Sequence, residues 1–383
     1  MTLTHLRGQR IHFAGSSDLD ANLFFLTYSH DLLKFLTHQF LLNGVGLVVQ
    51  LGDEPKHKSA NIPIIFDWTI LEAANECIKS KPISWPKSQG APIVVVGFSK
   101  SLKKIPPERR ELWEKLLSSG CVELKLIKRE LSIGGILREI QASYGDVLIT
   151  LGGGVGIHHI AEIYLEHKKT VIPLSLNIKK ENASLSLVTR AYEEPTTFFN
   201  YINNEKSLSA YSTLNLEKLI KPEEFWEKLK GFLEGIKKPH AFYVRLQNDE
   251  IPEYKLVENY FRTVIDKIVS DVGYDKYELG ISRSEDIFMN VELFKKLHYS
   301  SLVIVDMTAV RPNCCIELGY VLGLRKKIII TAMKGTKLPW DITSIRCHYW
   351  DPGEKNEEKI KELTTFMENN IIRGPLIKNE LEK

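Results

Sequence analysis

The fold is decided by residues 146–162, which read DVLITLGGGVGIHHIAE. An apolar, β-branched run leads through a cluster of glycines into a segment with apolar residues at helical spacing. A strand that is apolar on both faces and turns through glycine into a helix is typical of a parallel sheet covered by helices on both sides. This stretch therefore predicts an α/β fold built on a doubly wound parallel sheet.

The same order of strand and helix recurs along the chain. In the first half, strands are expected at Arg10–Gly15, Gly46–Gly52, Pro92–Ser99, Val122–Ile127 and Thr170–Leu174. In the second half, strands are expected at Ala241–Gln247, Ser301–Asp306, Lys327–Thr331 and Arg346–Trp350. We therefore predict two Rossmann-like doubly wound parallel-sheet domains.

An amphipathic helix predicted over residues 222–236 marks the boundary between the two series. It places an apolar stripe on one face, and Pro239 stops it soon afterwards. The expected organisation is a first domain over residues 1–220, a connecting helix over 221–238 and a second domain over 239–383. We expect the stripe to pack between the domains or between subunits and to carry a signal from one to the other. The stripe consists of Phe225, Trp226, Leu229 and Phe232.

Composition excludes several classes of protein. The 383 residues carry 51 Lys and Arg against 48 Asp and Glu, a balance of +3 that argues against a nucleic-acid or membrane binder. No apolar run approaches the length of a membrane span. Five cysteines with neither disulfide nor zinc spacing favour a reduced cytoplasm and no metal site. We expect a cytoplasmic protein without a cofactor.

The glycine cluster after residue 151 predicts an anion-binding site. Glycines let a phosphate approach the backbone, and the N-terminus of the following helix supplies free N–H groups. The turn after the first strand reads AGSSD (residues 14–18) and lies at the same edge of the sheet. The alternative is that these glycines serve only close packing. The candidate ligand contacts are Gly15, Ser16, Ser17, Gly153, Gly154, Gly156 and His158.

These two motifs resemble the SLOG superfamily, which pairs an opening I-x-x-x-G-S strand with a later G-G-x-G turn. The superfamily includes nucleotide phosphoribohydrolases and ligand-sensing domains of bacterial defence proteins. The phosphoribohydrolases carry P-G-G-x-G-T-x-x-E, whereas here Gly152 replaces the proline, Ile157 the threonine and Ile160 the glutamate. The resemblance therefore implies that the first domain binds a nucleotide-derived signal without cleaving it.

A pair of acids stands out in the second half. Residues 301–331 read SLVIVDMTAVRPNCCIELGYVLGLRKKIIIT, which predicts a buried strand ending at Asp306 and a helix carrying Glu317 in or near its first turn. There the helix dipole would hold the glutamate as an anion, which suits stabilisation of an oxocarbenium-like sugar during cleavage of an N-glycosidic bond. The alternative is that both acids serve only the helix terminus.

The same stretch resembles the signature of TIR-like and nucleoside-deoxyribosyltransferase-like domains, in which the helix glutamate is catalytic. The resemblance implies that Glu317 is the catalytic carboxylate. It also implies substrate contacts from the first strand of the domain, from the loop before its second helix, and from the ends of the strand and loop that precede Glu317. These contacts fall on Tyr243, Arg245, Ser282, Asp286, Asp306 and Asn313, with Arg283 beside them.

Together the two resemblances imply a signal-activated NAD⁺ glycohydrolase of antiphage defence. A nucleotide signal would occupy the first domain, and the second would cleave NAD⁺, as substrate, to nicotinamide and ADP-ribose. TIR-like sites commonly need a neighbouring subunit, so a homo-oligomer is expected. Two alternatives remain open: a nucleoside or nucleotide N-glycosidase or deoxyribosyltransferase that uses the same Glu317, and a non-enzymatic nucleotide-binding scaffold.

Overall fold

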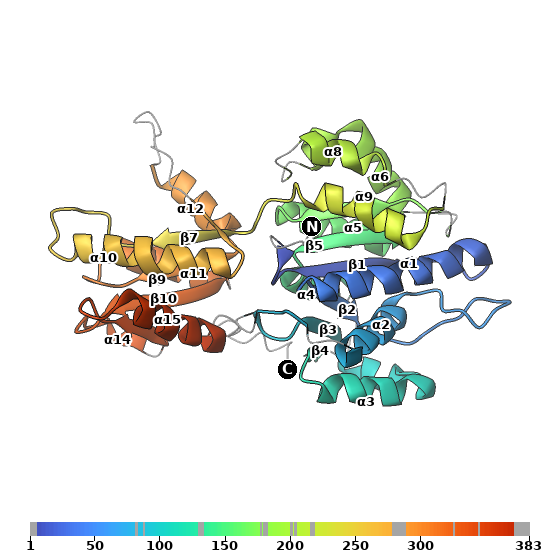
Figure 1. Cartoon of the computed structure of the whole chain (residues 1–383), viewed down its shortest axis with the longest axis horizontal. Helices are drawn as coiled ribbons and strands as arrows, with labels where there is room; N and C mark the ends of the chain where they lie inside the picture. The colour runs from blue at the N-terminus through green and yellow to red at the C-terminus, as the bar shows by residue number, and fades with distance from the viewer. Residues whose placement is uncertain are drawn as a thin grey trace. The chain divides into compact units, whose positions relative to one another are not determined.

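The computed structural model describes residues 6–370, except 81–82, 87–88, 129–133, 177, 179–182, 200–201, 203–204, 215–218, 278–288, 325 and 344. The chain divides into two compact units between Lys237 and Lys238, and Pro86–Gly90 belong to the second unit. Each unit is described by itself below. Figure 1 shows that each contains a central sheet covered by helices.

The first domain is a six-stranded parallel sheet in the order β4-β3-β2-β1-β5-β6. Its strands are β1 (Arg10–Ser16), β2 (Gly46–Gln50), β3 (Ile93–Phe98), β4 (Val122–Ile127), β5 (Val147–Gly152) and β6 (Thr170–Leu174). Its longer helices are α1 (Leu23–Leu42), α2 (Asp67–Ser80), α3 (Arg110–Ser118), α4 (Gly134–Tyr144), α5 (Val155–Glu166), α6 (Ala183–Glu193) and α9 (Pro222–Leu233). The shorter α7 (Pro195–Phe198) and α8 (Glu205–Tyr211) lie in the polar region before α9.

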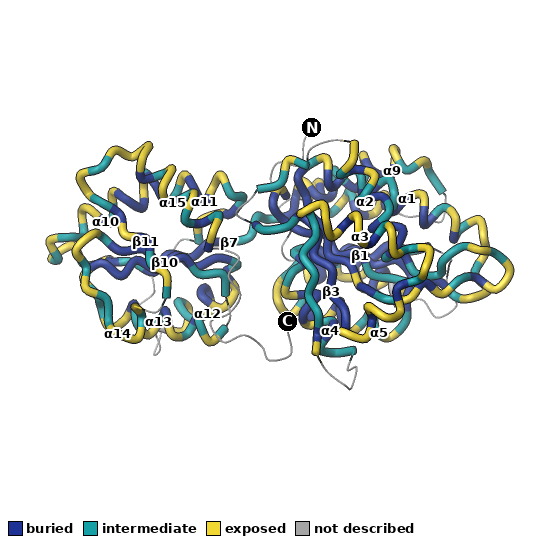
Figure 2. Tube along the Cα trace, turned by 90° about the horizontal axis from the view of Figure 1, so that it is seen from below, coloured by how far each residue is buried: buried dark blue, intermediate teal, exposed yellow. Residues whose placement is uncertain are grey.

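Alternating residues of one strand bury against helices on opposite faces of this sheet. Leu47 and Val49 belong to the large core that includes α1 and α2, whereas Val48 packs with Leu137 and Ile140 of α4. The sheet is therefore doubly wound, as the apolar strand pattern predicts. Figure 2 shows the buried strands enclosed by helices with exposed outer faces.

The order of strands places a switch point between β1 and β5. The chain runs outward from β1 through β2, β3 and β4, and then returns to the other side of β1 with β5. At this point the two strands come so close that a Cβ atom added to Gly15 would lie 1.8 Å from the carbonyl oxygen of Leu151. Ligands of open α/β sheets bind beyond the carboxyl ends of the strands at such a switch point.

The second domain is a five-stranded parallel sheet in the order β11-β10-β9-β7-β8. Its strands are β7 (His240–Val244), β8 (Asp275–Lys276), β9 (Leu302–Asp306), β10 (Lys327–Met333) and β11 (Cys347–Trp350). Its helices are α10 (Tyr254–Tyr260), a π-helical turn (Phe261–Ile265), α11 (Asp266–Asp271), α12 (Met289–Tyr299), α13 (Pro312–Gly323), α14 (Trp340–Thr343) and α15 (Asn356–Asn370). Two such domains confirm the predicted fold class.

The two faces of this second sheet hold separate cores. Tyr243 and Ile304 pack with residues of α10, α11 and α15, whereas Phe242 and Val305 pack with residues of α12 and α13. Which face a side chain reaches therefore depends on whether its position in the strand is odd or even. This alternation decides which predicted site residues can meet.

Helix α9 does not have the place expected for it. Its apolar stripe is buried in the core of the first domain, where Trp226 meets Phe40 of α1 edge-on at 5.3 Å between ring centroids. The expectation that the stripe packs between domains or subunits is therefore wrong. The periodicity showed that the stripe had to be covered, but it could not show that α1 and α8 of the same domain cover it.

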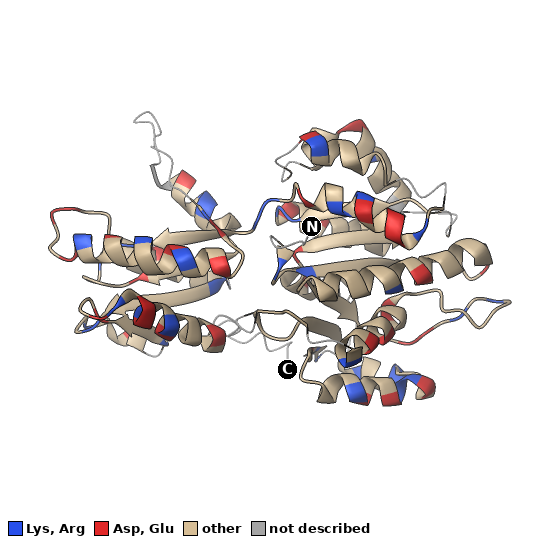
Figure 3. Ribbon diagram, viewed as in Figure 1, with Lys and Arg blue, Asp and Glu red and all other residues tan. Residues whose placement is uncertain are grey.

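The surface of the visible helices carries charges of both signs. Figure 3 shows Lys and Arg interspersed with Asp and Glu along the visible helices. In the part of the chain that the structure describes, no helix combines the length and the apolar character needed to cross a membrane.

We predict that Trp226→Ala destabilises the first domain by about 3–5 kcal/mol, because truncation leaves a cavity beside Phe40. Calorimetry of the full chain should show one unfolding transition moving to lower temperature. Trp340→Ala is the control, since Trp340 is 86% exposed and its loss should change stability little. Equal effects of the two substitutions would contradict the burial assigned to α9.

Candidate functional site

Glu317 lies in the second turn of α13, which begins at Pro312 with Arg311 as its N-cap. This agrees with the predicted position in or near the first turn, but stabilisation by the helix dipole is weak this far into the helix. The Glu317 side chain is partly buried, and this burial raises its pKa to about 7. The nearby Arg311 guanidinium opposes that shift only in part. The helix presents a carboxyl group that gains or loses its proton near neutral pH.

The sequence predicted a carboxylate that stays ionised, whereas the structure shows a carboxyl group that titrates near neutral pH. A group with a pKa close to the working pH can both donate and accept a proton during a reaction. Departure of a base that must be protonated calls for such a donor, and the carboxylate that remains can stabilise the positive charge on the sugar. The carboxyl of Glu317 can supply both roles in turn.

Asp306 performs a structural task. It ends β9 with an exposed fraction of 0%, and burial raises its pKa. Its carboxylate accepts hydrogen bonds from the Thr308 backbone N–H at 3.0 Å, the Thr331 hydroxyl at 2.8 Å and the Trp350 indole N–H at 3.1 Å. The geometry therefore does not support the predicted substrate contact, because the domain itself occupies this carboxylate.

Two residues near Glu317 remain accessible. Asn313 is exposed and lies four positions before Glu317, so the two side chains share one face of α13. Arg311 is partly exposed and close enough to influence the pKa of Glu317. Cys314 points into the core, where burial raises the pKa of its thiol to about 12 and keeps it protonated. The accessible set is therefore a carboxyl, an amide and a guanidinium.

The predicted contacts on β7 lie on the other side of the sheet. Tyr243 packs on Phe261 at 5.2 Å between ring centroids, and Arg245 forms an ion pair with Glu258 and lies over the same Phe261 ring. Both belong to the face covered by α10 and α11, whereas Glu317 belongs to α13 on the opposite face. The structure therefore does not bring Tyr243 and Arg245 together with Glu317.

The predicted contacts before the second helix, Ser282 and Asp286 with the adjacent Arg283, lie outside the described residues.

The glycine turn of the first domain forms where it was expected. Gly152 and Gly153 have φ values of 67° and 83°, which favour glycine, and Gly154 is the N-cap of α5. The Ile157 N–H donates to the carbonyl of the N-cap Gly154 at 2.8 Å, whereas the N–H groups of Val155 and Gly156 have no acceptor within the helix. The turn is thus able to receive an anion.

Only some of the predicted donors at this edge are available. Gly153 donates its N–H to the carbonyl of Ser16 at 2.8 Å, and the buried Ser17 donates its N–H to Ile64 at 2.8 Å. Gly15 provides the close contact between β1 and β5. Ser16 remains partly exposed at the end of β1. The edge therefore offers the N-terminus of α5 and the side chain of Ser16.

The sequence analysis missed a cation at this turn. A Cβ atom on Gly156 would lie 2.7 Å from a guanidinium nitrogen of Arg138, so this α4 side chain reaches the first turn of α5. Arg138 also lies 3.1 Å from His159, and His158 lies 2.7 Å from the Ser186 hydroxyl. No local motif marks Arg138, because only the packing of α4 beside α5 brings it there.

Ile160 occupies the position at which the phosphoribohydrolase motif has its glutamate. Ile160 is 2% exposed and packs in the core. Glu162, the nearest acid, forms an ion pair with Arg190 at 2.5 Å. The glycine turn of the first domain therefore has no free carboxylate at either of these two positions.

Comparison with known proteins supplies a family. The model of the family "ATP nucleosidase Cap17-like, N-terminal" matches residues 6–228, which is more than half of the chain. The chain belongs to this Cap17-like family. The match falls on the first domain, the one with the glycine turn.

A relative extends the likeness of this Cap17-like chain into the second domain. The protein named ATP nucleosidase Cap17 from Escherichia coli (strain KTE188) is 25% identical over 346 residues, which cover 86% of this chain and 66% of that protein. So few residues of this chain remain unmatched that the aligned segment must include Glu317. The Cap17-like chain spans slightly less than two thirds of its relative.

A solved structure is similar to part of the Cap17-like chain. The CMP N-glycosidase BcmB of Clostridium botulinum aligns with 32% of this chain and 97% of its own, at 19% identity and a TM-score of 0.22. A score this low does not establish a common fold.

Proposed function

We propose that the second domain is a nucleotide N-glycosidase with Glu317 as its catalytic carboxyl. The observation that carries this proposal is the half-buried carboxyl on α13, whose pKa is raised to about 7. The name of the aligned relative, ATP nucleosidase Cap17, supports the same class of reaction. Asn313 and Arg311 are accessible beside the carboxyl and are the proposed contacts to the substrate.

The proposed substrate is a purine nucleotide of the ATP class. Adenine is a poor leaving group as an anion, so its departure from the sugar needs a proton. A protonated Glu317 can donate that proton, and the resulting carboxylate can then stabilise the oxocarbenium-like sugar until water attacks. Water supplies the hydroxyl that joins the sugar, and the proton that this water loses returns to the Glu317 carboxylate, so water is the one co-reactant.

NAD⁺ is the second candidate, supported by the TIR-like signature around Glu317. Nicotinamide is cationic while bound to the ribose and leaves as a neutral molecule, so its departure needs no proton donor. An ionised Glu317 would then suffice as the stabilising anion. The two candidates therefore require opposite protonation states of one side chain.

The first domain is proposed to bind a nucleotide-derived signal that activates the second. The N-terminus of α5, Ser16 and Arg138 together offer phosphate-binding groups at the switch point of the sheet. In this proposal the protein is a cytoplasmic homo-oligomer of antiphage defence, and signal binding favours the active assembly by differential affinity. A non-enzymatic scaffold is the alternative that an activity measurement would test.

Glu317→Gln should abolish base release while the fold is retained, because the amide neither donates the required proton nor stabilises a cation as an anion does. Release of adenine from ATP and of nicotinamide from NAD⁺, measured by chromatography, is the readout. Glu357→Gln on the exposed side of α15 is the control and should keep wild-type turnover. Full turnover in folded Glu317→Gln would place the chemistry elsewhere.

The pH dependence of base release should separate the two substrates. With a purine nucleotide the active form is protonated Glu317, so the rate should fall as pH rises through about 7. With NAD⁺ the active form is ionised, so the rate should rise through the same range. Initial rates between pH 5.5 and 8.5 on each substrate give the answer, and a flat profile on both would exclude Glu317 as the titrating group.

Gly154→Asp should weaken nucleotide binding by at least tenfold, because it places a negative charge at the N-cap of α5 where a phosphate would sit. Aspartate is a favourable N-cap residue, so the helix should remain intact. Gly154→Asn has the same shape without the charge and serves as the control. Titration calorimetry with ATP, ADP-ribose and cyclic dinucleotides is the measurement, and equal affinities of both variants and wild type would place the ligand elsewhere.

A further inference from the structure

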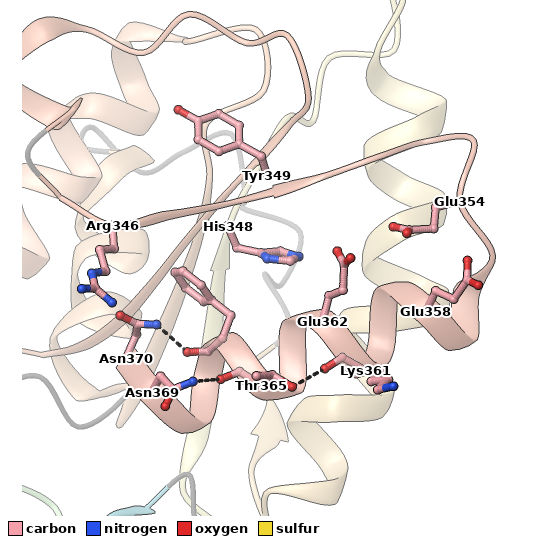
Figure 4. Close-up of a pocket in the computed structure, with 11 residues that line it drawn as sticks. Arg346, His348, Tyr349, Glu354, Glu358, Lys361, Glu362, Thr365, Asn369 and Asn370 are labelled. Atoms are coloured by element: carbon pink, nitrogen blue, oxygen red, sulfur yellow. Dashed lines mark hydrogen bonds between the residues drawn. The ribbon is translucent and has the colours of Figure 1, made fainter.

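A large groove lies in the second domain away from Glu317. It runs between β11 and α15, and its volume is about 1010 Å³. Neither Glu317 nor the accessible Asn313 and Arg311 lines it. Figure 4 shows side chains from β11, from the following loop and from α15 converging on this groove.

Buried polar atoms along the groove lack partners. His348 is 7% exposed, and its Nε2 has no hydrogen-bond partner among the residues that the structure describes. The same holds for Oε2 of Glu354 and for Oδ1 of Asn370, whose side-chain N–H groups are turned to the carbonyl of Phe366 at 2.7 Å. Buried polar atoms in folded proteins are nearly always paired, so each of these three can take a hydrogen bond from a water molecule or a ligand in the groove.

The unpaired groups can all act as acceptors. Burial lowers the pKa of His348 and the nearby Glu362 only partly opposes that shift, so the ring is neutral and Nε2 can offer a lone pair. The carboxylate of Glu354 and the amide oxygen of Asn370 accept hydrogen bonds only. A ligand that satisfies all three must be rich in hydrogen-bond donors.

The charge of the groove points the same way. Three carboxylates, those of Glu354, Glu358 and Glu362, line it against two cations, Arg346 and Lys361, and no ion pair joins any of the carboxylates to another described residue. Figure 4 shows the His348 ring directed toward the Glu362 carboxylate. Glu358 and Glu362 are one helical turn apart, where like charges destabilise a helix. A cation between them would remove that repulsion.

The spread of the acceptors excludes a single bound metal ion. Within the described part of the chain, no three His, Cys, Asp or Glu side chains are close enough to hold one. From Glu358 to Asn370 the groove follows about three helical turns, roughly 18 Å at 1.5 Å per residue. Arg346 and Lys361 also line the groove, and the Phe366 ring forms part of its wall. The ligand must therefore be elongated, with donors separated by apolar segments.

We propose that the groove between β11 and α15 binds a linear aliphatic polyamine. One ammonium group lies beside the Glu362 carboxylate and Nε2 of His348, which Figure 4 shows directed toward each other, and a second amino group lies beside Glu358, one helical turn away. The methylene chain packs on Phe366, and a further amino group extends toward Oδ1 of Asn370. This site is independent of the function proposed for Glu317.

The test is titration calorimetry of the full chain with spermidine at constant ionic strength. The double substitution Glu358→Gln and Glu362→Gln should weaken binding at least tenfold, because it removes two carboxylates from the groove. The matched control is Glu357→Gln with Glu368→Gln, which removes the same charge from the same helix outside the groove. Circular dichroism verifies that all variants are folded.

His348→Phe tests the buried acceptor, because it keeps a ring in the wall but removes Nε2. It should weaken spermidine binding several-fold without loss of the folded state. Failure of the wild-type chain to bind spermidine more tightly than sodium at equal ionic strength would overturn the proposal. Equal weakening in the groove variant and in the control variant would also overturn it, since binding would then follow the overall charge of α15.

Discussion

The second domain depends on the carboxylate of Asp306. This buried group ties the loop after β9 to β10 through Thr331 and to β11 through Trp350, so three strand ends are held together by one side chain. A buried carboxylate without these donors would be strongly unfavourable. Because the loop is fixed in this way, α13 starts at Pro312, and the start of the helix in turn determines where Glu317 emerges.

Local patterns in the sequence predicted the elements of the fold. The runs that became β5 and β9 are almost entirely apolar, which is typical of a strand buried on both faces of a parallel sheet. The glycine turn before α5 could also be located, because left-handed backbone at Gly152 and Gly153 leaves few other residues possible. The prediction of where the amphipathic α9 packs was wrong. Periodicity shows that one face of a helix is buried, but it does not show which neighbour buries it.

The candidate site was predicted less completely for the same reason. Glu317 follows from a local motif, but its raised pKa depends on burial by distant parts of the chain. Tyr243 and Arg245 were assigned to the site by resemblance, yet the register of β7 turns both toward α10 and α11. Arg138 was missed because only tertiary packing brings it to the glycine turn. Motifs thus located the backbone of each site, whereas long-range contacts determined its side chains.

The burial of the α9 stripe has a consequence for how such chains arise. Each domain keeps its hydrophobic core within itself, and α9 closes the first core before the chain enters the second domain. A recombination event after α9 would therefore leave the elements of the first hydrophobic core together in one piece. The family model that matches this chain ends at residue 228, inside α9. The first domain is thus suited to be inherited as one unit and fused to different second domains.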